Sequence, residues 1–209
     1  MTFRPLSVRP ARAGDPSEVE RIYEICLRTG AHGRDASGLF DDPRLLGDVY
    51  AGPYLAHSPD LAWVLAQDER SLPLGYFLAV ADTVAFEREL EDAWWPRLRA
   101  RRAGRPVRPG SLDARLRALI DAPPRTPASI TDRYPAHFHV DLLPEAQGGG
   151  NGRRLWATAV DALRARGVPG VHLGVAARNT NALGFYEHLG FGLLEDGPES
   201  KFLGMRLDG

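Results

Sequence analysis

The chain has 209 residues, of which 44% are apolar and 25% are charged, a balance typical of a folded globular protein. Its 26 basic and 27 acidic residues leave a net charge of −1, so no overall field favours nucleic acid or a membrane surface, and neither is expected as a partner. No run approaches the ~20 apolar residues of a membrane span, and the first residues lack the apolar core of a secretory signal, which predicts a cytoplasmic protein.

The first part of the chain predicts two helices and three strands. Polar residues around Asp15 are suited to cap the first helix, and Gly30 is suited to end it. The turn-like segment DERS predicts that the second and third strands form a hairpin. The predicted elements are a strand at 6–12, helices at 15–30 and 43–51, and strands at 60–67 and 73–82.

The composition of the chain changes between residues 83 and 133. We interpret this segment as a helical insertion within a single domain, 1–209. A charged helical stretch is interrupted by Pro96, and a second short helix follows a linker rich in glycine and proline. Six arginines fall between residues 97 and 108, beside Trp94 and Trp95. Such a run is usually a solvated helix face, although a lid over a substrate cleft and a surface for an acidic partner are alternatives.

The last part of the chain alternates between strands and helices, which predicts a mixed α/β fold with one twisted sheet. The strand HFHVDLLP is followed by a glycine loop and by a helix with an apolar stripe. A buried strand, VHLGVA, precedes a helix that Gly190 closes. The predicted elements are strands at 137–144, 171–176, 191–195 and 201–207, and helices at 151–166 and 179–190.

The glycine cluster QGGGNG lies between a predicted strand and an amphipathic helix, and it is either a plain turn or an anion cradle. Glycine loses much backbone freedom on folding, so a cluster indicates positive φ angles or close approach of a ligand. The strand–loop–helix order aims free amides and the positive end of the helix dipole at one point, which favours the cradle.

Two nucleotide-binding patterns fail at this loop. A triphosphate loop needs Gly-Lys followed by Ser or Thr, and a dinucleotide loop needs glycine at 153, where the chain has arginine. The pattern that remains is Q-x-x-G-x-G, formed by Gln147, Gly150 and Gly152. Arg153 adds a charged phosphate donor directly after it.

Two blocks of the chain resemble the GNAT superfamily, whose members transfer an acyl group from acyl-coenzyme A to an amine. The glycine loop is similar to the pyrophosphate-binding motif of that superfamily, and NTNALGFYEHLGF at 179–191 resembles its later signature. Residues 134–191 also look like the acetyltransferase-like domain at the C-terminus of O-GlcNAcase and its free-standing bacterial relatives. The resemblance implies a mixed α/β (α+β) fold, with helices on both faces of a twisted central sheet and a helical insertion before the fourth strand.

The resemblance also implies how acetyl-CoA binds as the acetyl donor. A bulge in the fourth strand would turn main-chain groups between Val140 and Leu143 toward the thioester and the pantetheine arm. Asn179 would cap the later helix and bind the same arm, and Tyr186 would protonate the departing thiolate as the catalytic acid. The residues implied to bind the coenzyme are Val140, Leu142, Leu143, Gln147, Gly148, Gly149, Gly150, Asn151, Gly152, Arg153, Asn179, Ala182 and Tyr186.

The catalytic base is sought on the strand before the glycine loop. His137, His139 and Asp141 alternate and so share one face of that strand, where Asp141, His139 or a water molecule could take the proton of the amine. Asp141 lies closest along the chain to the implied thioester site. The same H-x-H-x-D pattern suggests a metal less readily, because no further ligand cluster lies nearby. His172 is expected to be a sheet histidine that could neighbour the acceptor site.

These features predict an N-acetyltransferase whose acceptor is an amine, on either a small molecule or a protein. A catalytically inactive acetyl-CoA-binding sensor or interaction domain is the alternative. A nucleic-acid-binding protein using the arginine-rich insertion is a weaker one. A proton donor at Tyr186 favours the enzyme, because a protein that only binds the coenzyme does not need one.

Overall fold

The computed structural model describes residues 5–208, which form one seven-stranded sheet in the order β1-β2-β3-β4-β5-β7-β6. Every neighbouring pair of strands is antiparallel except β4 and β5, which are parallel. The prediction of a mixed α/β fold with one central sheet is therefore confirmed. The strands are β1 Ser7–Pro10, β2 Ala62–Ala66, β3 Gly75–Val80, β4 Ala136–Leu142, β5 Gly170–Ala176, β6 Gly192–Asp196 and β7 Ser200–Arg206.

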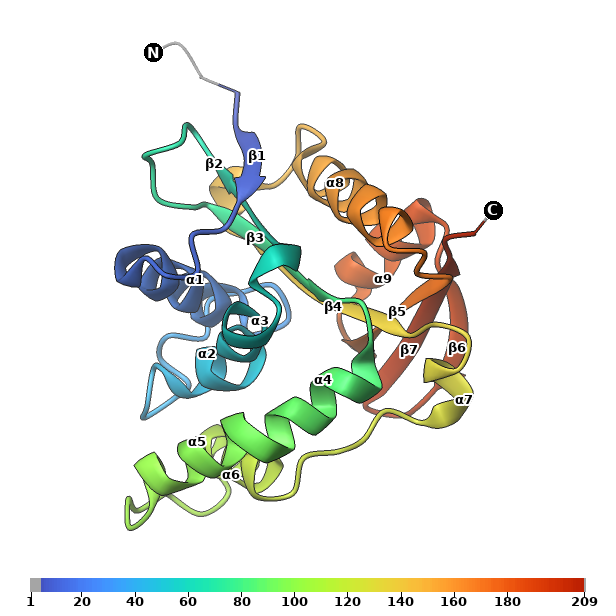
Figure 1. Ribbon diagram of the computed structural model, residues 1–209. Coiled ribbons are helices and arrows are strands. Elements are labelled where there is room, and N and C mark those ends of the chain that lie inside the picture. Colours follow the sequence, from blue (N-terminus) through green and yellow to red (C-terminus); the bar gives the residue numbers. More distant parts are fainter. Residues whose placement is uncertain (1–4, 209) are drawn as a thin grey trace.

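Helices cover both faces of the sheet (Figure 1). One face carries α1, α2 and α3 together with α4, α5 and α6 of the insertion, and the other carries α8 and α9. The helices are α1 Pro16–Thr29, α2 Leu45–Tyr50, α3 Gly52–His57, α4 Thr83–Glu89, α5 Trp95–Arg102, α6 Leu112–Asp121, α7 Ala128–Thr131, α8 Asn151–Ala165 and α9 Thr180–Leu189. The structure adds α3 and α7, which the sequence pattern did not predict.

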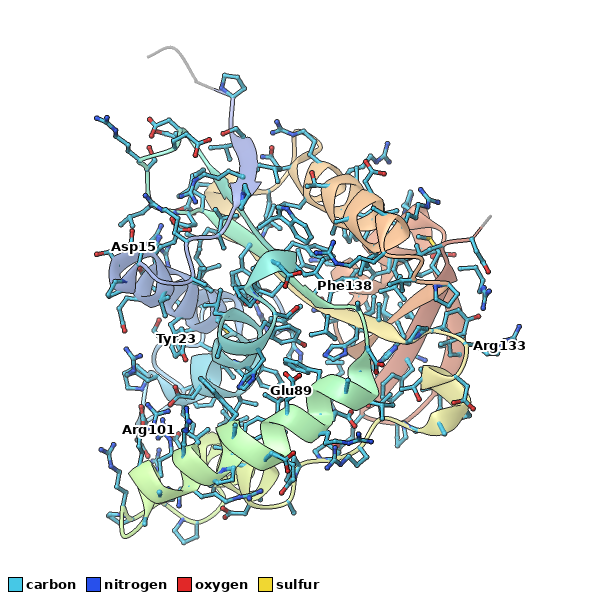
Figure 2. The ribbon with its side chains drawn as sticks, in the orientation of Figure 1. Asp15, Tyr23, Glu89, Arg101, Arg133 and Phe138 are labelled. Carbon is cyan, nitrogen blue, oxygen red and sulfur yellow. The ribbon has the colours of Figure 1, made fainter. Side chains whose placement is uncertain are left out.

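Each face of the sheet has its own hydrophobic core, because successive side chains of a strand point to opposite faces. The α1-side core contains Ile22, Ile25, Leu45, Val64, Tyr76, Leu78, Leu98, Ile120 and Leu143, among others. The α8-side core contains Leu65, Phe77, Phe138, Leu155, Trp156, Leu163, Tyr186 and Phe191, among others. Figure 2 shows Phe138 of β4 inside the molecule and Glu89, Arg101 and Arg133 at its surface.

Pro96 does not interrupt the first helical stretch of the insertion, as the sequence pattern had suggested. One wide turn, the π-helical segment Leu90–Trp94, joins α4 to α5, and the amide of Trp95 bonds the carbonyl of Leu90. Proline has no amide proton, and its ring collides with the carbonyl four residues earlier in a regular helix. The wide turn before Pro96 accommodates both features, so the chain stays helical from Thr83 to Arg102.

The arginine run in the insertion is only partly a solvated face. Arg102 is 6% exposed, and it pairs with Asp42 and, at 2.5 Å, with Asp48. Asp48 also accepts a hydrogen bond from the hydroxyl of Tyr23 at 3.1 Å. The insertion is therefore anchored to α2 through the buried charges of Arg102 and Asp48, and the Tyr23 hydroxyl connects α1 to the same carboxylate. The remaining arginines of the run that lie on its surface are Arg97, Arg101, Arg105 and Arg108.

A second buried ion cluster joins β1 to α1. The carboxylate of Glu18 is fully buried and accepts hydrogen bonds from the guanidinium groups of Arg9 and Arg12 and from the amide of Arg12, over distances of 2.6 to 2.9 Å. Arg9 is itself 4% exposed. Charges taken out of water require such partners, so this cluster fixes the first strand against the first helix.

Among residues 5–208, no helix has both the length and the apolar character needed to cross a membrane. The helical stretch from Thr83 to Arg102 carries charged residues throughout, and α8, with 15 residues, is shorter than the ~20 apolar residues that a bilayer core requires of a helix. Its apolar residues form a stripe that packs on the sheet rather than covering the whole helix.

Candidate functional site

β4 and β5 are parallel neighbours that pair only near their first residues. Their register joins Ala136 to Val171 and His137 to His172, and no later pairing of these strands is found in the described part of the chain. β3 nevertheless follows β4 as far as Leu142, and β7 follows the whole of β5. The two strands therefore diverge from a vertex at His137 and His172, and their facing edges beyond it are unpaired.

One hydrogen bond shows which β4 amides face that unpaired edge. The amide of Leu143 donates to the carbonyl of Leu74 at 2.9 Å, which extends the β3–β4 register by one pair. Bonded and non-bonded pairs alternate in an antiparallel ladder, so Val140 and Leu142 turn their amides toward β5. Leu143 was also predicted to bind the coenzyme. Its amide already donates to the carbonyl of Leu74, so, unlike the amides of Val140 and Leu142, it does not face the unpaired edge.

The bulge implied for the fourth strand is absent from the β3–β4 ladder. The register runs without a shift from His137 to Leu142, so each residue of this segment has one partner in β3. The free main-chain groups arise instead because β5 separates from β4. The divergence of β4 and β5 therefore leaves main-chain groups of β4 free for a ligand, which is the role that the bulge was expected to have.

The glycine loop adopts a conformation that only glycine tolerates well. Gly148, Gly149 and Gly150 follow one another with φ angles of 76°, 58° and 76°, in the left-handed region where a Cβ atom is unfavourable. Their amides, and those of Gly152 and Arg153, donate to no group within residues 5–208. Five amides are therefore free at the start of α8, where the helix dipole also favours an anion.

Two side chains of this segment stabilise the loop itself. The amide nitrogen of Gln147 donates to the carbonyl of Leu142 at 3.0 Å, and that of Asn151 donates to Ala146 at 2.8 Å. Gln147 and Asn151 therefore hold the loop against the end of β4 and leave the main chain to meet a ligand. Arg153 is exposed beside the free amides, which suits a charged donor to a phosphate.

We expect Gly150→Ala to weaken acetyl-CoA binding about tenfold. A left-handed conformation costs a residue with a Cβ about 1–2 kcal/mol, so the free loop of the variant relaxes out of it and binding must restore it at that cost. About 1.4 kcal/mol is a factor of ten in affinity. Gly167→Ala is the matched control, because Gly167 also has a positive φ of 70° but lies after α8, with no atom near an added Cβ. Calorimetry with acetyl-CoA measures both variants, and equal affinities would contradict the cradle.

α9 begins where the later signature predicted. Asn179 caps it, and its side-chain oxygen accepts from the amide of Ala182 at 3.2 Å, so its amide nitrogen stays available to a ligand. Ala182 and Tyr186 are one turn apart and both pack against the α8-side core. An added Cβ on Gly152 would come within 3.1 Å of Phe185, so the glycine at 152 lets α8 and α9 approach.

Tyr186 lies on the α8 side of the splayed strands. Its ring contacts Phe138 of β4, with the ring centroids 5.9 Å apart. Its hydroxyl has no hydrogen-bond partner in the described chain, yet it is not among the polar atoms sealed from solvent. Burial, and then the negative charge of Asp141, raises the pKa of Tyr186 above its ordinary value, so the phenol keeps its proton at neutral pH.

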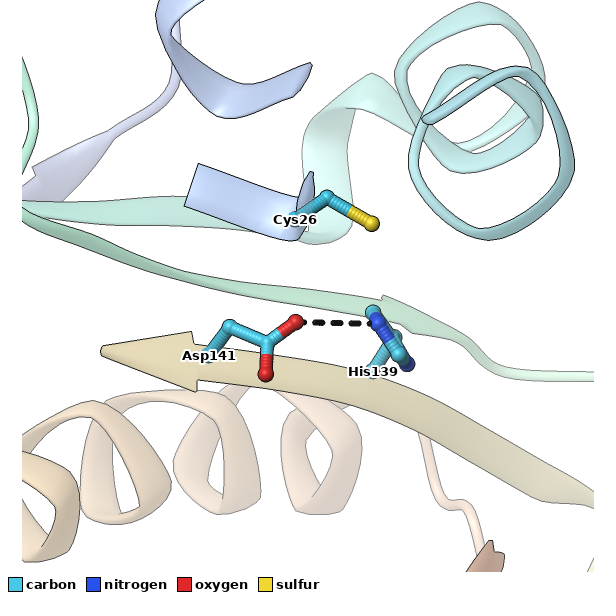
Figure 3. A group of neighbouring side chains, drawn as sticks. All are labelled: Cys26, His139 and Asp141. Atoms are coloured by element: carbon cyan, nitrogen blue, oxygen red, sulfur yellow. Dashed lines mark ion pairs between the residues drawn. The ribbon is translucent and has the colours of Figure 1, made fainter. Parts of the chain in front are cut away.

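Asp141 and His139 belong to a hydrogen-bonded cluster on the opposite face of β4. Nε2 of His139 lies 3.1 Å from Oδ2 of Asp141, and the hydroxyl of Tyr76 donates to the same oxygen. Figure 3 shows these two side chains side by side, with Cys26 of α1 above them; one ligand atom from each of the three lies within 4.8 Å of the others. Two residues of the H-x-H-x-D pattern, His139 and Asp141, therefore lie together with Cys26 of α1. His137 is not part of this group.

His139 is held in its charged form. Burial disfavours the charge, but the attraction of Asp141 and the hydrogen bond to it outweigh this effect and raise the pKa of His139 to about 10. The ring also stacks between Tyr50 and Tyr76, at centroid distances of 5.7 and 5.8 Å. A protonated imidazole has no lone pair to accept a proton, so of the two predicted bases the arrangement favours Asp141.

His137 and His172 face each other at the vertex, with ring centroids 5.6 Å apart. Burial, and then the like charges of His172 and His139, lowers the pKa of His137 to about 3. Burial also lowers the pKa of His172. Both rings are therefore neutral at neutral pH, and each has one nitrogen that can accept a hydrogen bond.

A cavity of about 280 Å³ lies over this vertex, on the face opposite Tyr186. Its floor includes His137 and His172, and Tyr54 of α3 contributes to its wall. The insertion supplies much of the remaining wall, with Phe86 and Trp95 among its apolar members. The insertion therefore covers this part of the sheet, but none of the six arginines between residues 97 and 108 lines the cavity, so the lid predicted for that run stays a prediction.

Sequence reasoning missed two residues that position this site. Tyr76 contributes the hydroxyl that bonds Asp141, and Thr83 contributes the hydroxyl that contacts Nδ1 of His137 at 2.7 Å. Tyr76 lies directly opposite Asp141 in the β3–β4 register. A correct alignment of the predicted hairpin with the fourth strand would have paired these two residues, but the sequence alone does not set that alignment.

Comparisons with known proteins agree with this geometry. Residues 48–191 match the model of the acetyltransferase (GNAT) family. The crystal structure of SsHAT is similar over 98% of this chain and 100% of that one, with 37% identity and a TM-score of 0.88. The PaiA N-acetyltransferase from Thermoplasma acidophilum, solved in complex with coenzyme A, shares the fold at 12% identity, with a TM-score of 0.53 over 96% of this chain and 98% of that one.

A curated relative shares a shorter segment. Mycothiol acetyltransferase from Beutenbergia cavernae is 54% identical over 48 residues, which are 23% of this chain and only 16% of that enzyme. The finer resemblance to the domain found in O-GlcNAcase stays a prediction. The family match covers most of the sheet together with the glycine loop and α9, so this chain belongs to the acetyltransferase (GNAT) family.

Proposed function

We propose that this protein is a single-domain N-acetyltransferase that transfers the acetyl group of acetyl-CoA to an amine. The proposal rests on one observation above all: five free amides at the start of α8 lie directly after the unpaired edge of β4. A diphosphate needs several donors at one point. An extended arm that contains amide groups needs an unpaired strand edge. The two features follow one another along the chain, as the two parts of coenzyme A do.

The residues present fit the coenzyme. Gly148, Gly149 and Gly150 border open space, since an added Cβ would meet no atom within 4 Å. That space is where a diphosphate would lie, with Arg153 at its side. Val140 and Leu142 would bond the arm, and Asn179 would bond it from α9. Bound acetyl-CoA supplies the acetyl group as an activated thioester.

The chain's own residues then divide the remaining work. The amide of Val140 donates a hydrogen bond to the thioester oxygen and so stabilises negative charge on it. Tyr186, which keeps its proton, donates it to the departing sulfur. Asp141 accepts the proton that the amine loses, directly or through a water molecule. Tyr76 and His139 orient the Asp141 carboxylate, because both bond its Oδ2 atom.

The test combines calorimetry with acetyl-CoA and a screen of amines that follows the release of free thiol. We expect micromolar to millimolar binding and thiol release with at least one amine. No detectable binding at millimolar acetyl-CoA would overturn the proposal. Binding without thiol release for any primary amine would instead support the alternative, an inactive acetyl-CoA-binding domain.

A further inference from the structure

The two histidines on the floor of the cavity over the vertex offer hydrogen-bond acceptors and no donors to its interior. His172 places Nδ1 2.6 Å from the carbonyl oxygen of Tyr134, and a carbonyl only accepts, so Nδ1 carries the proton. The hydroxyl of Thr83 donates its proton to the carbonyl of Pro135 at 2.7 Å. It therefore accepts from Nδ1 of His137. In both neutral rings Nε2 is left as the acceptor.

Both Nε2 atoms open onto the cavity. Neither has a partner within residues 5–208, and the sealed side-chain atoms without a partner in that range are the Nε atoms of Arg9 and Arg102. His137 and His172 both line the cavity. Two unused acceptors thus line the same part of the cavity, on rings whose centroids are 5.6 Å apart, close enough for one small ligand to contact both rings.

The other residues that line the cavity leave no unpaired charge to bind a charged group of a ligand. Tyr54, Phe86 and Trp95 contribute aromatic surface. The charged groups Glu87 and Arg125 lie 3.7 Å apart and pair with each other, and Glu87 also accepts from the amide and the hydroxyl of Thr126 at 2.9 and 2.8 Å. His139, the remaining charged group among the lining residues, is paired with Asp141. The walls therefore suit an uncharged, apolar body.

We infer that His137 and His172 clamp the acceptor as a neutral primary amine carried on a small apolar body, with each Nε2 atom accepting one of its two N–H bonds. A primary amine held in this way keeps its nitrogen lone pair free for attack. The proton that the nitrogen then loses leaves along one of these N–H bonds to an Nε2 atom, from which water carries it to Asp141. The vertex where the clamp lies is also where the unpaired edge of β4 begins, so the amine is held at the start of the edge along which the coenzyme arm is proposed to lie. This inference deepens the proposed function and rests on it.

Asparagine variants test the clamp while preserving the fold. His172→Asn and His137→Asn each keep an amide nitrogen near the position of Nδ1, which can still donate to Tyr134 or Thr83, but they delete Nε2. With phenethylamine as the acceptor, we expect each variant to raise KM about tenfold and to leave the affinity for acetyl-CoA within twofold of wild type. His188→Asn is the matched control, because Nδ1 of the exposed His188 makes the same kind of bond to Gly184 away from the cavity.

Substrate selectivity of the wild-type protein gives an independent measurement. We expect phenethylamine to exceed N-methylphenethylamine, glucosamine and spermidine at least tenfold in kcat/KM. Unchanged KM values in both folded variants, or equal turnover of the polar amines, would overturn the clamp while acetyl-CoA binding and thiol release still supported the enzyme. If no amine is turned over, calorimetric binding of phenethylamine to the protein with coenzyme A decides, and equal binding by His172→Asn refutes the clamp.

Discussion

Replacing Tyr186 by phenylalanine should lower kcat by about 10²–10⁴-fold, the range typical of a lost general acid. The raised pKa of this phenol keeps it protonated, and its hydroxyl has no partner in the described chain that the substitution would disrupt. The variant should therefore fold as wild type and keep its affinity for acetyl-CoA. Thiol release at saturating amine measures the change in kcat, and calorimetry measures the coenzyme affinity.

Tyr23→Phe is the control for this experiment. It also removes one buried phenolic hydroxyl, which bonds Asp48 at 3.1 Å, but it does so on α1, away from the splayed strands. We expect it to lower the free energy of unfolding by about 1 kcal/mol and to leave kcat unchanged. Equal kcat values for Tyr186→Phe and wild type would refute the acid role and leave acetyl-CoA binding unaffected.

The parts of the site that sequence could predict are those encoded by neighbouring residues. The three consecutive glycines at 148–150 require positive φ angles, and all three have them. Asn179 was expected to cap a helix, and it accepts from the amide of Ala182. Alternation placed His139 and Asp141 on one face of a strand, and they form an ion pair. Each of these features depends on a few adjacent residues.

The parts that sequence did not predict depend on contacts between distant segments. Tyr76 bonds Asp141 across 65 residues of chain, and Arg102 bonds Asp48 across 54. The proline at 96 read as a helix break, whereas one wide turn accommodates it. Phe86 and Trp95 looked like residues of a charged surface helix, and they form the wall of the cavity. Their roles depend on where the insertion packs, which no local pattern reveals.

The buried carboxylate of Glu18 should be among the largest single contributors to stability. Glu18→Ala leaves Arg9, which is 4% exposed, as a buried charge without its partner, and breaking such a pair costs about 3–5 kcal/mol. Domains of this kind are stable by roughly 5–15 kcal/mol in total. Urea unfolding followed by tryptophan fluorescence measures the loss. Glu24→Ala on the same helix removes only exposed pairs with Arg21 and Arg28 and should cost less than about 1 kcal/mol.

The same cluster predicts how stability depends on pH. Burial alone would raise the pKa of Glu18, but the hydrogen bonds from Arg9 and Arg12 outweigh it and lower the pKa below its ordinary value. A carboxylate with a lowered pKa stabilises the fold above its unfolded pKa, and it loses this effect as the pH falls through the folded value. The stability gap between wild type and Glu18→Gln should therefore be full at neutral pH and shrink as the pH falls below about 4. A gap of constant size down to about pH 2, well below the ordinary carboxyl range, would mean that folding does not lower the pKa of Glu18 and that its negative charge is not the source of the gap.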